Sequence, residues 1–323
     1  MKRLLLILLL SCLFPLKVFC NDSFPYTKVI YFGDSLTDDG NLYKALFHII
    51  PKSPPYYEGR FSNGIVWSEY LTTYLKTNYP YVSFENDAVG GETVLPHKIS
   101  EGHLPWTLDQ SINNYFKRKN TDNSTTLYFV WIGANDYNGG STDPDELTSE
   151  VVNQIHYSIE QLINHGAKHF IILNLPDLSR TPAAKLNNME SILYTLTVLH
   201  NSKLAGAMFQ LQMQYPNVAI RMFDIFGLFN DLIDHTAAVN QKFNTHIKDT
   251  SSSCWAGGYT IRRSTMTEEN PDLSAAYEVG KNYENGMVPC SNPDELLFWD
   301  KVHPTAVTQE ILAKTIEQFV FYR

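Results

Sequence analysis

The sequence KVIYFGDSLTDDGN, residues 28–41, decides the fold of this chain. Its first five residues, Lys28–Phe32, are rich in β-branched and aromatic side chains and predict a short buried strand. The residues Asp38–Asn41 favour a turn and the start of a helix. Ser35 would then follow the carboxyl end of a first strand, where sites gather in open α/β sheets, and it is a candidate nucleophile. Gly-Asp-Ser is also ordinary turn chemistry, so other parts of the chain must decide between these interpretations.

Predicted strands and helices alternate along the rest of the chain. Further strands are expected at 81–85, 125–132, 168–175 and 218–225, where residues are apolar in runs or in alternation. Helices are expected at 65–76, 106–117, 145–165, 188–215 and 305–322, with shorter helices in 226–246. This alternation is typical of a parallel sheet with helices on both faces, joined by right-handed crossovers. We therefore expect an α/β fold with five parallel strands.

The first 20 residues have the pattern of a secretory signal. A basic start precedes the apolar run Leu4–Leu10, and Val18 and Cys20 stand at the −3 and −1 positions of a cleavage site. The apolar run is too short to span a bilayer as a permanent helix. We therefore expect a secreted or periplasmic protein. An alternative is a lipoprotein signal, in which Cys12 would carry the lipid.

The charge of the chain argues against several classes of partner. Its formal net charge is −9, and removal of three basic residues with the signal gives 22 basic and 34 acidic residues, or −12. An acidic chain without a basic cluster is not expected to bind nucleic acid. Electrostatic attraction to anionic membranes is disfavoured too. Peripheral contact with a membrane would have to use apolar and aromatic side chains.

Two cysteines, Cys254 and Cys290, lie outside the signal. In an exported protein such a pair is expected to form one disulfide, with two free thiols or a metal site as the alternatives. No CxxC pair and no HExxH motif occurs, so we expect no metal, and we expect no cofactor. The segment at about 249–293 is polar and holds both cysteines. We interpret it as a disulfide-bounded insertion in a single domain of residues 21–323.

Four short blocks carry groups with catalytic chemistry. They hold Ser35, Gly91, Asn135 and the pair Asp300 and His303. Each lies where a predicted strand ends or where the last helix begins. Because these points share one edge of a doubly wound sheet, the blocks could converge. Each block also has an ordinary interpretation: a glycine turn at Gly91, an Asx turn at Asn135 and a surface histidine at His303.

The chemistry of these groups fits an acyl transfer. Histidine can take the proton of a serine hydroxyl, and a carboxylate can fix the tautomer of that histidine. Asp300 precedes His303 by three residues, so we expect one turn to place both side chains on one face. The backbone N–H groups of Ser35 and Gly91 and the side-chain amide of Asn135 could bind an oxyanion.

Together the blocks resemble the GDSL family of the SGNH hydrolases. The family's order and spacing are present in Gly33–Leu36, Gly91, Gly133–Asp136 and Asp300–His303, and the flanking residues 59–64, 67, 86–93, 131–137 and 174–182 extend the similarity. The resemblance implies a flavodoxin-like αβα sandwich that hydrolyses carboxylic esters through an acyl-enzyme. By position it implies that Ser35 is the nucleophile and His303 the base. It further implies that Asp300 orients this base, and that Gly91 and Asn135 form the oxyanion hole.

Within the family, the extended block Gly33–Asn41 resembles bacterial secreted phospholipase A, lysophospholipase and glycerophospholipid–cholesterol acyltransferase enzymes, above all of the Legionella type. This implies a lipid ester substrate, with cholesterol as an acyl acceptor. A short-chain or carbohydrate acetylesterase is an alternative, and a non-catalytic surface-binding protein is an alternative of another class. Some relatives have a disulfide-bounded loop that an activating protease cuts. We predict the same for the 254–290 loop, with Arg262 and Arg263 as a cut site.

Overall fold

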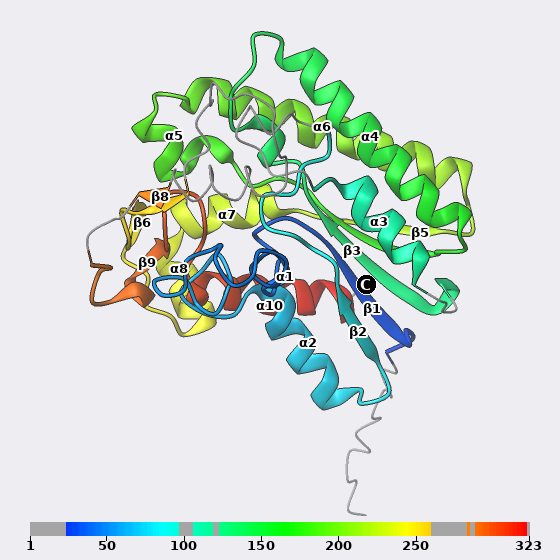
Figure 1. The fold of residues 1–323 in the computed structure, drawn as a ribbon, viewed down its shortest axis with the longest axis horizontal. Coiled ribbons are helices and arrows are strands. Elements are labelled where there is room, and N and C mark those ends of the chain that lie inside the picture. Colours follow the sequence, from blue (N-terminus) through cyan, green and yellow to red (C-terminus); the bar gives the residue numbers. More distant parts are fainter. Residues whose placement is uncertain (1–23, 97–105, 119–122, 260–282, 285–287, 322–323) are drawn as a thin grey trace, which may run out of the picture.

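A five-stranded parallel sheet forms the centre of the protein (Figure 1). The computed structural model describes residues 24–96, 106–118, 123–259, 283–284 and 288–321. The strand order is β2-β1-β3-β4-β5. The strands are β1 (Lys28–Gly33), β2 (Ser83–Asn86), β3 (Thr126–Trp131), β4 (His169–Leu173) and β5 (Ala219–Phe223). Each lies within two residues of its predicted bounds.

The two central strands, β1 and β3, explain why the catalytic blocks meet. Every residue of both strands is buried, as expected for a strand covered on both faces. They pair in parallel from Lys28 opposite Thr126 to Gly33 opposite Trp131. Because both strands end at the same level, the turns that follow them, with Ser35 and Asn135, leave the same edge of the sheet.

Helices cover both faces of the sheet, so the predicted αβα sandwich is confirmed. They are α1 (Asn41–Ala45), α2 (Trp67–Asn78), α3 (Leu108–Lys117), α4 (Pro144–Asn164), α5 (Pro182–Leu186), α6 (Glu190–Gln214), α7 (Ile225–Asp234), α8 (Thr236–Phe243) and α10 (Ala306–Phe321). Helices α3, α4 and α6 lie on one side, and α2 and α10 on the other (Figure 1). Alternate strand residues divide between these layers: Ile30 packs with the first group and Tyr31 with the second.

Local sequence signals set the helix starts. The side chain of Asp143 accepts the N–H of Glu146 at 3.0 Å, and Pro144 occupies the first turn of α4, where a missing N–H costs nothing. Thr107 caps α3 in the same way and forms a capping box with Gln110. Helix α4 therefore begins one residue before its predicted start at 145, and α3 begins two residues after its predicted start at 106.

The polar segment before the last helix is anchored to the rest of the fold. Strand β6 (Asp249–Ser253) pairs with β9 (Leu296–Phe298), and β7 (Gly258–Tyr259) pairs with β8 (Tyr283–Glu284). A disulfide joins Cys254 and Cys290, in agreement with the sequence. Sequence analysis did not predict these short pairings, because they join segments without apolar periodicity.

Several predictions fall outside the described residues. These are the signal at 1–20, the alternative lipid site at Cys12 and the cut site at Arg262 and Arg263. The single-domain assignment also stays a prediction. Within the described ranges, no helix combines the length and hydropathy needed to cross a membrane.

Candidate active site

Ser35, His303 and Asp300 form a continuous chain of hydrogen bonds. The hydroxyl oxygen of Ser35 lies 2.8 Å from Nε2 of His303. Nδ1 of the same imidazole lies 2.7 Å from Oδ2 of Asp300. Because an ionised carboxylate can only accept, Nδ1 carries the hydrogen, and Nε2 is left as the acceptor of the serine proton. All three side chains are buried, with Asp300 the deepest at 2% exposure.

Asp300 and His303 meet in a turn that precedes α10, and their side chains point toward each other. The helix begins only at Ala306. Oδ1 of Asp300 accepts the backbone N–H groups of Val302 at 2.8 Å and His303 at 2.7 Å. The aspartate therefore builds the turn that brings the imidazole back to its own carboxylate.

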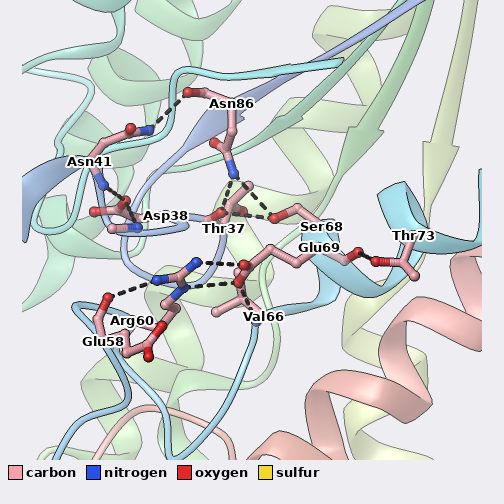
Figure 2. A network of polar contacts seen from close by, with 11 residues as sticks. Thr37, Asp38, Asn41, Glu58, Arg60, Val66, Ser68, Glu69, Thr73 and Asn86 are labelled. Carbon is pink, nitrogen blue, oxygen red and sulfur yellow. Dashed lines mark hydrogen bonds and ion pairs between the residues drawn. The ribbon is translucent and has the colours of Figure 1, made fainter. Parts of the chain in front are cut away.

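The turn that carries Ser35 is tied to α2 and to the end of β2 (Figure 2). The carbonyl of Thr37 accepts hydrogen bonds from the Ser68 hydroxyl at 3.0 Å and from Nδ2 of Asn86 at 2.8 Å. Nδ2 of Asn41 in turn donates to the carbonyl of Asn86 at 2.8 Å. These side chains satisfy backbone groups that a sharp turn leaves unpaired, and so they fix the path of the chain around Ser35.

The same region contains a bidentate ion pair (Figure 2). Nη2 of Arg60 lies 2.7 Å from Oε1 of Glu69, and Nε lies 3.2 Å from Oε2. Oε2 of Glu69 also accepts the N–H of Val66 at 3.0 Å, at the start of α2. The pair thereby fastens the proline- and tyrosine-rich loop at 51–59 to the helix beside the serine turn.

The candidate oxyanion donors lie in the turns after β2 and β3. Gly91 has φ +77°, which a glycine adopts without strain. Nδ2 of Asn135 donates to the carbonyl of Glu92 at 2.8 Å, which orients the amide beside Gly91 and leaves its second N–H available. Asp136 accepts two further backbone N–H groups from this loop, both at 2.9 Å.

A buried histidine, His200, packs against the turn that carries Asn135. Gly133 has φ +115°, and a Cβ there would lie 2.9 Å from Cε1 of His200. Nδ1 of His200 is 2.7 Å from the hydroxyl of Tyr137. Burial lowers the pKa of His200 to about 3, so the imidazole is neutral at ordinary pH. His200 therefore serves packing and orientation and does not carry charge into the site.

The charge of Asp300 is retained despite its burial. Burial raises the pKa of this carboxyl, but the charge of a protonated His303 and the hydrogen bond from its ring lower it. Hydrogen bonds from Tyr56 and the Val302 N–H lower it further, so the pKa of Asp300 lies below its usual value. An ionised Asp300 is what a protonated His303 needs beside it.

The pKa of Asp34, one residue before Ser35, is shifted in the opposite direction to that of Asp300. Burial raises the pKa of Asp34 to about 6, and the N–H of Leu36, which donates at 3.0 Å, offsets this only in part. The charge of His303 lowers the pKa of Asp34 as well. The two carboxyl groups near the imidazole therefore differ in charge below neutral pH.

Comparison with known proteins assigns the chain to a family. The family model described as GDSL-like Lipase/Acylhydrolase matches residues 29–316. The protein belongs to the GDSL-like lipase/acylhydrolase family. As a GDSL protein it is a carboxylic ester hydrolase by family, in agreement with the resemblance that its four blocks indicate.

Similar GDSL proteins include two from bacteria. The chain is 30% identical to a phosphatidylcholine-sterol acyltransferase from Aeromonas hydrophila, over 95% of this chain and 94% of that protein. It is 26% identical to the secreted effector protein SseJ from Salmonella typhimurium, over 91% of this chain and 64% of that protein. Among solved structures, an acetyl xylan esterase aligns with a TM-score of 0.42 and 16% identity, covering 91% of this chain and 99% of that one.

All five predicted site residues of this GDSL protein line one pocket of about 410 Å³: Ser35, Gly91, Asn135, Asp300 and His303. Apolar side chains form much of the remaining wall, from α1, α5, α6 and α7 among other elements. They include Leu42, Ile50, Phe61, Ala184, Leu186, Met189, Leu193, Phe229 and Ile233. A pocket of this size and lining suits an apolar group that is held beside the serine.

Aromatic residues from the loops and elements around the pocket differ in where they lie. Phe61 lines the pocket, whereas Trp67 and Tyr137 belong to the core and Tyr57 is 40% exposed. Tyr56 is buried and donates a hydrogen bond to Asp300, a partner that no local pattern predicts. Across the described residues, no three His, Cys, Asp or Glu side chains gather where they could hold a metal.

Proposed function

We propose that this GDSL protein is an exported serine esterase that hydrolyses acyl esters of phospholipids and lysophospholipids. The observation that carries the proposal is the hydrogen-bonded series Ser35–His303–Asp300 at the wall of a largely apolar pocket. It combines an activated nucleophile with space for an acyl chain.

The proposed reaction begins with attack of the Ser35 hydroxyl oxygen on the ester carbonyl while Nε2 of His303 takes the serine proton. Asp300 stabilises the imidazolium that forms. The N–H groups of Ser35 and Gly91 and the Asn135 amide receive the oxyanion. Collapse of the intermediate expels the alcohol, which takes the proton back from His303, and leaves an acyl-Ser35. Water or another hydroxyl then removes the acyl group by the same steps in reverse order.

The substrate class rests on the pocket and on the relatives. Each buried methylene contributes about 0.8 kcal/mol, so a long acyl chain would gain much from the apolar wall and an acetyl group very little. The phosphatidylcholine-sterol acyltransferase relative supports a phospholipid donor and a sterol such as cholesterol as an acyl acceptor. Export is supported by the signal pattern at the start of the chain and by a relative described as a secreted effector.

The test is an analysis of products by mass spectrometry. Purified protein is incubated with diacyl- and lysophosphatidylcholine vesicles, with and without cholesterol, and Ser35→Ala serves as the control. Release of fatty acid supports the hydrolase, and formation of cholesteryl ester supports acyl transfer. A parallel series of p-nitrophenyl esters separates the alternatives: turnover of acetate alone would favour an acetylesterase, and no turnover at any chain length would favour a binding protein.

A further inference from the structure

Tyr56 contacts the catalytic carboxylate directly. It lies in the loop at 51–59, far from Asp300 in the sequence, yet its hydroxyl donates a hydrogen bond to Oδ2 of Asp300. This is the same oxygen that accepts Nδ1 of His303 at 2.7 Å. Tyr56 is 2% exposed and does not line the pocket, so its hydroxyl faces the aspartate and not the substrate.

Aromatic neighbours hold the ring of Tyr56 in place. Trp255 packs edge-on against it with ring centres 5.2 Å apart, and Phe61 packs at 5.5 Å. Trp255 directly follows the disulfide-bonded Cys254, and its backbone N–H donates to the carbonyl of Trp299 at 2.8 Å. The residue that supports Tyr56 is therefore fixed to Trp299, which directly precedes Asp300.

The carboxylate of Asp300 is fully engaged. Oδ1 accepts two backbone N–H groups, from Val302 and His303, and Oδ2 accepts Tyr56 and the imidazole. Removal of the phenol would leave Oδ2 with the imidazole as its one hydrogen-bond donor among the described residues. A carboxylate with one donor fewer is a stronger base toward the imidazolium, and its plane is less firmly held.

We propose that Tyr56 is a positioning residue of the esterase: its hydroxyl holds Oδ2 of Asp300 in line with Nδ1 of His303 and reduces the basicity of the carboxylate. The inference rests on the proposed function, because it concerns the same hydrolytic step. Another titratable group near the imidazole, Asp34, interacts electrostatically with His303 and stays unchanged in the variants below.

The experiment compares Tyr56→Phe with Tyr128→Phe. Tyr128 is also a fully buried tyrosine with a side-chain hydrogen bond, 3.0 Å to the hydroxyl of Tyr115, but it lies in β3 away from the pocket. Both variants lose one buried hydroxyl and keep the ring. Values of kcat and KM for a soluble short-chain p-nitrophenyl ester are measured from pH 4.5 to 9, together with Tm.

We expect Tyr56→Phe to lower kcat about tenfold, the size of a lost hydrogen bond to a charged group, with KM little changed. The acid limb of its kcat/KM profile should move to higher pH, because the more basic carboxylate favours protonation of the catalytic base. Tyr128→Phe should lower Tm but keep the wild-type kcat and profile. A wild-type profile in Tyr56→Phe, or a uniform loss at all pH values with no shift, would overturn the inference.

A second variant covers the case in which Tyr56→Phe does not fold. Trp255→Phe keeps the phenol but loosens the ring packing that holds it, and a smaller shift of the acid limb in the same direction is expected. An unchanged limb would overturn the inference. A wild-type protein without turnover would instead refute the proposed function, and this result is read before any variant is compared.

Discussion

Oδ2 of Asp38 accepts the backbone N–H of Gly90 at 2.7 Å. One buried carboxylate therefore connects the turn after Ser35 to the turn that carries Gly91. The same side chain accepts the N–H groups of Gly40, Asn41 and Leu42, so it organises the nucleophile turn and the candidate oxyanion hole together. A shift of either turn would separate the donor from the oxyanion.

Asp38→Asn is expected to impair both stability and catalysis. An amide NH₂ would face backbone N–H donors, so at least one charge-assisted hydrogen bond is lost, at a cost of about 3 kcal/mol. A displacement of Gly91 by about 1 Å would lower kcat about 100-fold. Urea unfolding and ester kinetics measure the two effects. Asp39→Asn is the matched control, because Oδ1 of Asp39 is buried with no hydrogen-bond partner among the described residues, so a much smaller loss is expected from this variant.

Ser35→Ala should abolish turnover and leave the fold intact. The hydroxyl is a reactant, so kcat should fall about 10⁴-fold or more, and His303→Ala should have a comparable effect. A pre-steady-state burst with a p-nitrophenyl ester should disappear in both variants, while circular dichroism and Tm stay near wild type. Substantial turnover by folded Ser35→Ala would reject the assignment of the nucleophile.

Glu92 is expected to make the protein less stable as the pH rises. Its side chain is fully buried, and burial raises its pKa well above 4.5, an effect that a side-chain interaction with Ser111 offsets only in part. An acid with a raised pKa in the folded state contributes stability below its unfolded pKa and loses that contribution as the pH rises through the folded value.

Glu92→Gln should therefore match wild type in acid and become relatively more stable at alkaline pH. Thermal unfolding of both proteins from pH 4.5 to 9 tests this difference. Asp34 and Asp38 have a raised pKa too, to about 6 in each case, and their charges also raise the pKa of Glu92, so the difference between the two proteins includes these repulsions. Melting curves that stay parallel over the whole pH range would contradict the prediction.

Leu186 offers a test of the acyl pocket that should not disturb folding. It lines the pocket on α5 but is 66% exposed. Leu186→Asp places a charge on the apolar wall, so kcat/KM for long-chain esters should fall about tenfold, whereas short-chain esters should be little affected. Leu186→Met is the conservative control. An equal loss at all chain lengths would argue that the acyl chain lies elsewhere.

The strands were predictable because a continuous run of apolar residues indicates a buried strand. The run at 125–132 has the apolar continuity of a strand covered on both faces, and β3 occupies Thr126–Trp131. The kind of turn at Asp300–His303 was not predictable from spacing, because an i, i+3 pair suits a helix as well as a non-helical turn. The decisive hydrogen bonds run from a side chain to its own backbone, which periodicity does not report.

The sequence by itself determined the order of strands and helices, the four blocks and the identity of Ser35, Asp300 and His303 as candidates. These depend on local patterns and on residue chemistry. Only the tertiary structure decided which distant groups support them. Tyr56 on Asp300 and Asp38 on Gly90 are contacts between segments 244 and 52 residues apart. Such contacts exist only because β1, β2 and the chain before α10 end at one edge of the sheet. Local sequence patterns do not predict which distant segments meet there.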